Sequence, residues 1–140
     1  MGLKLELVAH NTGVEALVAT AMLTTTSSSR PSSIYHSLSK DPERVDRLLG
    51  RLEVQHGSIL GHNRLCWIAE ASEGEVLGIL LKNRFFSFTR LDDSRWLLSS
   101  NLRTAIRYAQ ENKDQFGRSL LESICDVVPT IVRDIRVRLL

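Results

Sequence analysis

Cysteine is scarce in this 140-residue sequence, which contains only Cys66 and Cys125. The two residues lie far apart in single apolar settings, without the paired spacing that zinc sites and redox motifs use. This pattern argues against a cysteine-based metal site or redox motif, and no other metal site is expected. It predicts two buried, unreactive thiols.

Long hydrophobic runs are also missing. No window approaches the roughly 18 apolar residues that a membrane helix needs. Near the N-terminus, Leu3, Leu5 and Leu7 alternate with Lys4 and Glu6, whereas a signal peptide would begin with a continuous apolar block. We therefore expect a cytoplasmic protein that does not contact the membrane.

Neither charge sign is in large excess, because the net charge is only +2 and 24% of the residues are charged. A dedicated nucleic-acid-binding domain is usually more basic, so any cationic site must be local. Arg133, Arg136 and Arg138 alternate with apolar residues and favour an amphipathic helix that packs on the domain or on another subunit. Nucleic-acid binding through these arginines is the least favoured of the functions considered.

The length suits one domain, expected to span residues 1–140. The hydrophobic patterns predict an α+β protein in which a small mixed or antiparallel sheet packs with several helices. The expected elements are a strand at 3–8, helices at 14–22 and from 42 to a stop at 56–57, a strand at 64–71, a helix at 73–81, an extended segment at 85–89, and helices at 96–109, 115–128 and 129–138.

Local side chains indicate where several of these helices begin. Asp41 before Pro42 is a typical helix cap, and the segment from Ser72 to Glu75 matches a capping box. Asp92, Asp93 or Ser94 is expected to cap the helix that carries Trp96. The hydroxyl-rich run at 24–33 predicts a mobile loop. A solvated connector is favoured there, and the alternative is a lid that orders around a phosphate with Arg30 as its anchor.

The most informative stretch runs from Lys82 to Trp96 and places cations and hydroxyls among aromatic residues. Such groups suit a flavin or a nucleotide phosphate. His56 and His62 precede this stretch at a similar spacing to the histidines of one enzyme family. In order and spacing the two blocks resemble the flavin-dependent thymidylate synthase family, also called the thymidylate synthase-complementing proteins.

Individual residues carry this resemblance. Lys82, Asn83 and Arg84 correspond to an Arg-His-Arg triplet, Ser87 to the serine that follows it, and Arg95 to the arginine that closes the signature. Asn101 and Arg103 look like the family's Asn-x-Arg element on a later helix, and Arg107 looks like an arginine near its Ala-Gln pattern. The resemblance implies the family's α+β fold.

The resemblance also implies a reaction, the reductive methylation of dUMP to dTMP, with FAD as cofactor and NADPH and methylenetetrahydrofolate as co-substrates. It further implies a homo-oligomer, a tetramer in the family, and assigns no catalytic side chain. The residues implied to bind the cofactor are His56, Lys82, Asn83, Arg84, Ser87 and Asn101. Those implied to bind the substrate are Ser94, Arg95, Arg103 and Arg107.

A second interpretation stays open because several signature residues of this sequence differ from those of the family. Lys82 stands where the family has arginine, Asn83 where it has histidine, and Arg90 where it has a carboxylate. A lysine does not reproduce the planar, bidentate guanidinium. Lys82 and Arg84 also suit a helix C-terminus without any ligand. The alternative is a noncatalytic relative that keeps the oligomeric scaffold and binds a nucleotide or a protein partner.

Overall fold

The computed structural model describes residues 3–24, 26–51 and 59–139, with side chains as far as residue 135. It confirms the α+β class. The elements are β1 (Lys4–His10), α1 (Val14–Thr24), α2 (Pro31–Ser39), α3 (Pro42–Leu49), η2 (Ile59–Gly61), β2 (Leu65–Glu70), α4 (Glu73–Lys82), β3 (Ser87–Arg90), β4 (Arg95–Ser100), α5 (Leu102–Glu111), α6 (Gln115–Ile124) and α7 (Pro129–Leu139).

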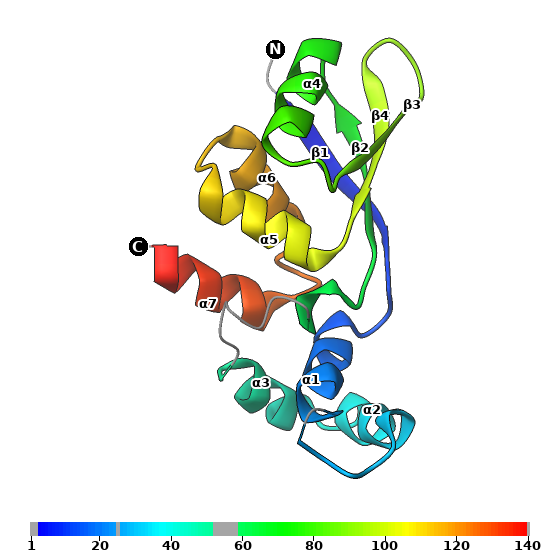
Figure 1. Ribbon diagram of the computed structural model, residues 1–140, viewed down its shortest axis with the longest axis vertical. Coiled ribbons are helices and arrows are strands. Elements are labelled where there is room, and N and C mark those ends of the chain that lie inside the picture. Colours follow the sequence, from blue (N-terminus) through cyan, green and yellow to red (C-terminus); the bar gives the residue numbers. More distant parts are fainter. Residues whose placement is uncertain (1–2, 25, 52–58, 140) are drawn as a thin grey trace.

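The strands form one antiparallel sheet in the order β1-β2-β4-β3. Trp67 of β2 pairs with Leu7 on one side and Leu98 on the other. Side chains alternate across a strand, so Trp67 and Leu98 are fully buried while the neighbouring Leu97 is 37% exposed. Helices α5 and α6 lie against the buried face (Figure 1), where Trp67 Nε1 donates a 2.8 Å hydrogen bond to Ser123 of α6.

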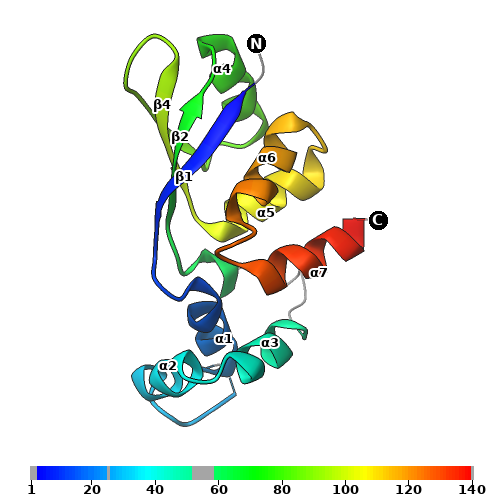
Figure 2. The same cartoon turned by 180° about the vertical axis from the view of Figure 1, so that it is seen from behind.

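Helices α1, α2 and α3 pack together beyond the far end of β1, and α7 lies between them and the α5–α6 pair (Figure 2). Two carboxylates, one from α1 and one from α3, accept hydrogen bonds from residues at the start of α7. Glu15 accepts a 3.0 Å hydrogen bond from Ile131 N, and Asp46 accepts one of 2.8 Å from the Thr130 hydroxyl. Burial raises the pKa of Glu15 despite the bonds that its carboxylate accepts.

The predicted caps of α3 and α4 are confirmed. The Asp41 side chain accepts a hydrogen bond from Arg44 N at 3.2 Å. Ser72 Oγ accepts from Glu75 N at 3.1 Å, and Glu75 accepts from Ser72 N at 3.0 Å, which completes the capping box. Local side-chain chemistry thus fixes the start of α4, the helix whose other end carries the predicted signature.

The helix predicted to carry Trp96 is wrong over its first part, because residues 95–100 form strand β4. Asp92 caps a turn here and not a helix: its side chain accepts hydrogen bonds from Ser94 N at 3.0 Å and Arg95 N at 2.8 Å. This turn reverses the chain and pairs β4 with β3. The helix begins only at Leu102, after the cap residue Asn101.

The predicted loop at 24–33 is too long, because its last residues, Pro31, Ser32 and Ser33, form the first turn of α2. Proline is well suited to the first turn of a helix, and Ile34 and Leu38 are buried four residues apart on one face. Helix α3 ends at Leu49. The stop predicted at His56 and Gly57 lies outside the described residues.

The structure also bears on three smaller predictions. Cys66 and Cys125 are only partly buried, so the prediction of buried thiols was too strong. Arg133 forms exposed ion pairs with Asp46 and Asp134, while the side chains of Arg136 and Arg138 lie outside the described part. Within the described ranges, no helix has both the length and the apolar character that crossing a bilayer requires.

Candidate functional site

After the end of α4, some side chains of the predicted signature point into the core and others point to solvent. Asn83 leaves the helical conformation with φ −153° and ψ 114°, and its side-chain oxygen accepts a hydrogen bond from Phe85 N at 2.8 Å. The chain then enters β3 with Phe86 only 4% exposed and Phe85 61% exposed. Phe86 packs edge-on against Tyr108 and Phe116, so it belongs to the core.

A groove of about 340 Å³ lies between this end of α4 and the exposed side of α5. We call it the α4–α5 groove. Its described lining residues are Leu80, Leu81, Lys82, Asn83, Arg84, Phe85, Arg107 and Glu111. It therefore brings together four of the ten residues that the sequence analysis assigned to ligand binding.

Two guanidinium groups dominate the charge of the α4–α5 groove. The Arg84 guanidinium carbon lies 5.2 Å from the centre of the Phe85 ring, a cation–π distance. Arg107 Nε lies 3.4 Å from Glu111 Oε1, with both side chains more than half exposed. An exposed ion pair of this kind is weak. Arg107 thus keeps most of its capacity to bind an anion.

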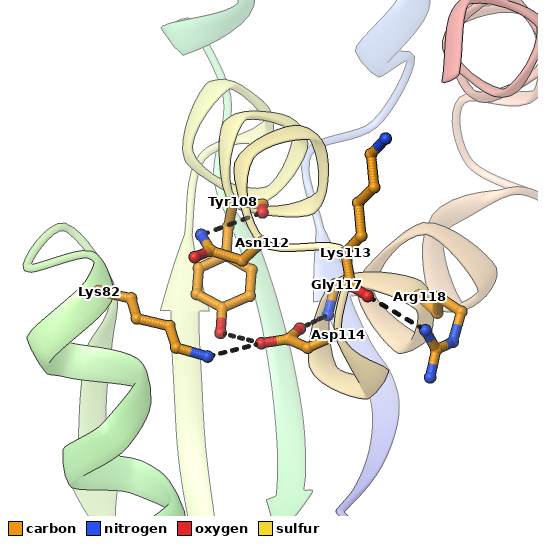
Figure 3. A network of polar contacts seen from close by, with 7 residues as sticks. All are labelled: Lys82, Tyr108, Asn112, Lys113, Asp114, Gly117 and Arg118. Carbon is orange, nitrogen blue, oxygen red and sulfur yellow. Dashed lines mark hydrogen bonds and ion pairs between the residues drawn. The ribbon is translucent and has the colours of Figure 1, made fainter. Parts of the chain in front are cut away.

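Lys82 forms a polar cluster with Tyr108 and Asp114 (Figure 3). Lys82 Nζ lies 3.1 Å from Asp114 Oδ2, and the Tyr108 hydroxyl donates to the same oxygen at 2.7 Å. The other oxygen, Oδ1, accepts from Gly117 N at 2.8 Å and caps α6. These residues border a second, smaller cavity of about 200 Å³.

The cluster changes the acidity of its members. Partial burial of Asp114 opposes its ionised form, but hydrogen bonds from Tyr108, Gly117 and Lys82 outweigh this effect and lower its pKa. Burial, reinforced by the hydrogen bond and the negative charge of Asp114, raises the pKa of Tyr108. Tyr108 is therefore a neutral donor and Asp114 a carboxylate at neutral pH.

The other predicted site residues do not line the α4–α5 groove in the described part of the chain. Asn101 accepts a hydrogen bond from Thr104 N at 2.9 Å and caps α5. Arg95 Nε is paired with Asp92 Oδ2 at 2.6 Å. Ser87 is exposed at the start of β3, and Arg103 is exposed on α5. His56 lies outside the described residues.

Ser94 borders a different and larger cavity of about 780 Å³ near the start of α4. Its described lining consists of Lys4, Glu70, Ala71, Ser72, Glu75, Asp93 and Ser94. Carboxylates outnumber cations here, so this cavity does not suit a phosphate. Of the four residues predicted to bind substrate, Arg107 lines the α4–α5 groove, Ser94 lines this larger cavity, and Arg95 and Arg103 are not among the described lining residues of either.

Asp114 and Tyr108 are neighbours of the signature that the sequence did not predict. The available signal was local, because an aspartate directly before a helix at Gln115 is a typical cap. That pattern does not reveal that the same carboxylate binds Lys82, which lies 32 residues away. No described group of histidine, cysteine, aspartate and glutamate residues could hold a metal ion.

No protein-family model matches this sequence, and a search of the curated proteins finds no match. The resemblance to flavin-dependent thymidylate synthases thus rests on the motifs alone.

Proposed function

We propose that this chain binds a phosphate-bearing ligand of the nucleotide or flavin class in the α4–α5 groove. The supporting observation is that Arg84 and Arg107, which are far apart in the sequence, line one groove beside the exposed ring of Phe85. Guanidinium groups bind phosphate through paired, charge-assisted hydrogen bonds, and an aromatic ring can cover a base or an isoalloxazine.

The size of the groove limits which part of a ligand one chain holds. Small-molecule sites usually measure roughly 300–1,000 Å³, and this groove, at about 340 Å³, lies near the lower limit. It suits a phosphate with one ring system, as in dUMP or one half of FAD. The remainder of an FAD molecule would need a further surface, which agrees with the homo-oligomer that the resemblance implies.

The first candidate function is flavin-dependent thymidylate synthase chemistry, in which dUMP is methylated to dTMP. FAD, once reduced by NADPH, supplies the hydride in this reaction, and methylenetetrahydrofolate supplies the carbon. In our proposal Arg84 and Arg107 bind and orient the anionic ligand, and Phe85 shields one face of its ring. Such chemistry depends on positioning and needs no titrating side chain from this groove.

The second candidate is a noncatalytic relative that binds a nucleotide without flavin. The observation that favours it is the commitment of signature residues to internal contacts. Lys82 is paired with Asp114, Asn83 accepts a hydrogen bond from Phe85 N, and Asn101 caps α5. In this account the scaffold and the two arginines remain, while the groups that would hold a flavin have taken structural roles.

Equilibrium titrations of the purified protein with FAD and with dUMP separate the candidates, and its visible absorption spectrum reports any flavin carried through purification. Binding of both ligands supports the synthase, and binding of dUMP alone supports the noncatalytic relative. Failure to bind either ligand, with the fold intact by circular dichroism, would refute the proposed function.

A further inference from the structure

Helix α4 leaves one apolar side uncovered. Leu77 is 56% exposed and Leu81 is 88% exposed, and they lie four residues apart on the same side of the helix. The opposite side carries Val76 and Ile79, which are buried in the core. Burial of leucine is favourable, so two leucines this exposed on one helix need an explanation.

Two glycines lie next to this side of α4, and Gly78 also borders the smaller cavity beside Lys82 and Asp114. A Cβ atom at Gly78 would meet no described atom within 4 Å, and one at Gly74 would meet only Ser72 Oγ at 4.0 Å. The packing of this chain therefore requires neither glycine. Each costs about 1 kcal/mol of helix stability relative to alanine. Their absent side chains would, however, allow another helix to approach closely.

The charges along α4 indicate which helix could pack on its uncovered side. The helix begins with Glu73 and Glu75 and ends with Lys82, followed by Arg84. An antiparallel copy of α4 would set its acidic start beside this basic end, and the two helix dipoles would also be favourably opposed. Leu77 and Leu81 lie two residues on either side of Ile79, so a two-fold axis at the level of Ile79 would place each of them against the other residue of the second copy.

We propose that two copies of this chain associate through antiparallel α4 helices. Leu77 lies against Leu81 of the second copy, and Glu73 lies near Arg84 of the second copy. Glu73 is available for this contact because its pair with Arg90 is long, at 3.8 Å, and 67% of the Glu73 side chain is exposed. The interface is self-complementary, as two-fold symmetry requires.

This inference does not rest on the proposed ligand. Leu81 and Arg84 also line the α4–α5 groove, but Leu77 is not among its described lining residues, so a change at Leu77 tests the interface without altering the groove. Sedimentation velocity over a range of protein concentrations tests it with Leu77→Glu. The wild type should dimerise, and the variant should dissociate at least about tenfold more readily. Leu91→Glu is the matched control, because Leu91 is 50% exposed in the β3–β4 turn, and it should dimerise like the wild type.

Cysteine cross-linking tests the direction of packing. In a background with Cys66→Ala and Cys125→Ala, mixing Leu77→Cys with Leu81→Cys should give a disulfide-linked pair of unlike chains. Either variant alone should cross-link poorly. Efficient cross-linking of Leu77→Cys to itself would indicate parallel helices and overturn the proposal.

A charge exchange tests the proposed pairing of Glu73 with Arg84. Glu73→Arg should weaken the dimer, and adding Arg84→Glu should restore it. Monomeric wild-type protein at every concentration, or a folded Leu77→Glu variant that dimerises normally, would refute the interface. Monomeric protein that binds vesicles containing anionic lipid through Leu77 would show that a membrane surface, and not a second copy, covers α4.

Discussion

Lys82 Nζ lies 3.1 Å from Asp114 Oδ2, and this ion pair joins the end of α4 to the start of α6. Both side chains are partly exposed, so the pair itself is weak. The pair matters because it places Lys82, a cation of the predicted signature, next to a carboxylate. A ligand phosphate near Lys82 must therefore compete with Asp114.

The first prediction follows from this competition. Asp114→Asn should leave the oxygen that caps α6 but remove the charge that holds Lys82, so dUMP should bind about 2- to 10-fold more tightly. Lys82→Ala in the otherwise native chain should change the affinity little. Isothermal titration calorimetry measures both effects. Weaker binding by Asp114→Asn, with the fold intact, would show that the carboxylate contacts the ligand favourably.

The second prediction concerns pH. The pKa of Asp114 is lower in the folded chain than its ordinary value of 3.8, so its carboxylate stabilises the fold above that pH. This contribution is lost as the pH falls through the folded value. Urea unfolding should therefore show Asp114→Asn less stable than the wild type at neutral pH, with the difference shrinking below about pH 4.

Glu15 provides a control of opposite sign for the pH experiment. Its pKa is raised above 4.5, so its favourable contribution is present below that pH and is lost as the pH rises through the folded value. Glu15→Gln should therefore gain stability relative to the wild type as the pH rises. The same trend in both variants would contradict the assigned shifts.

The third prediction contrasts two adjacent phenylalanines. Phe86 is 4% exposed and packs against Tyr108 and Phe116, so Phe86→Ala should lower the free energy of unfolding by about 3–5 kcal/mol. Phe85 is 61% exposed, so Phe85→Ala should cost less than about 1 kcal/mol and should instead weaken ligand binding. Chemical denaturation and dUMP titration of the two variants measure this contrast.

The fourth prediction assigns Asn101 to stability and not to cofactor binding. Asn101→Ala should cost about 1 kcal/mol through loss of the α5 cap, whereas Asn101→Ser should keep most of the stability. Neither variant should change FAD affinity by more than about twofold. A large loss of FAD affinity in Asn101→Ser would restore the role that the resemblance implies.

Much of the fold could be predicted because local chemistry dictates it. The capping box at Ser72 fixes the start of α4, and Asp41 with Pro42 fixes the start of α3. The error at β4 arose because Asp92 suits either a helix cap or a turn, and only pairing with β2 and β3 decides between them. The buried apolar residues of β4, Trp96 and Leu98, follow a strand period, but Leu97 between them is also apolar, so the sequence alone does not show the alternation.

The candidate site was less predictable because its geometry depends on contacts between distant residues. Lys82, Asn83 and Arg84 are adjacent in sequence, so their shared location was foreseeable. The approach of Arg107 to them, and the binding of Lys82 by Asp114, depend on how α5 and α6 pack. No short motif encodes these contacts, and the separation of Ser94 and Arg95 from the groove has the same origin.

The central claim is that Arg84 and Arg107 bind one anion together, and its most direct test is dUMP affinity in Arg84→Ala, Arg107→Ala and the double variant. Arg103→Ala is the matched control, because Arg103 is exposed on the same helix as Arg107 and is not among the described groove residues. Each single groove variant should lose about 10- to 100-fold in affinity, the double variant should show non-additive losses, and Arg103→Ala should bind like the wild type. Equal effects in all three single variants, or none in Arg84→Ala and Arg107→Ala, would contradict the account.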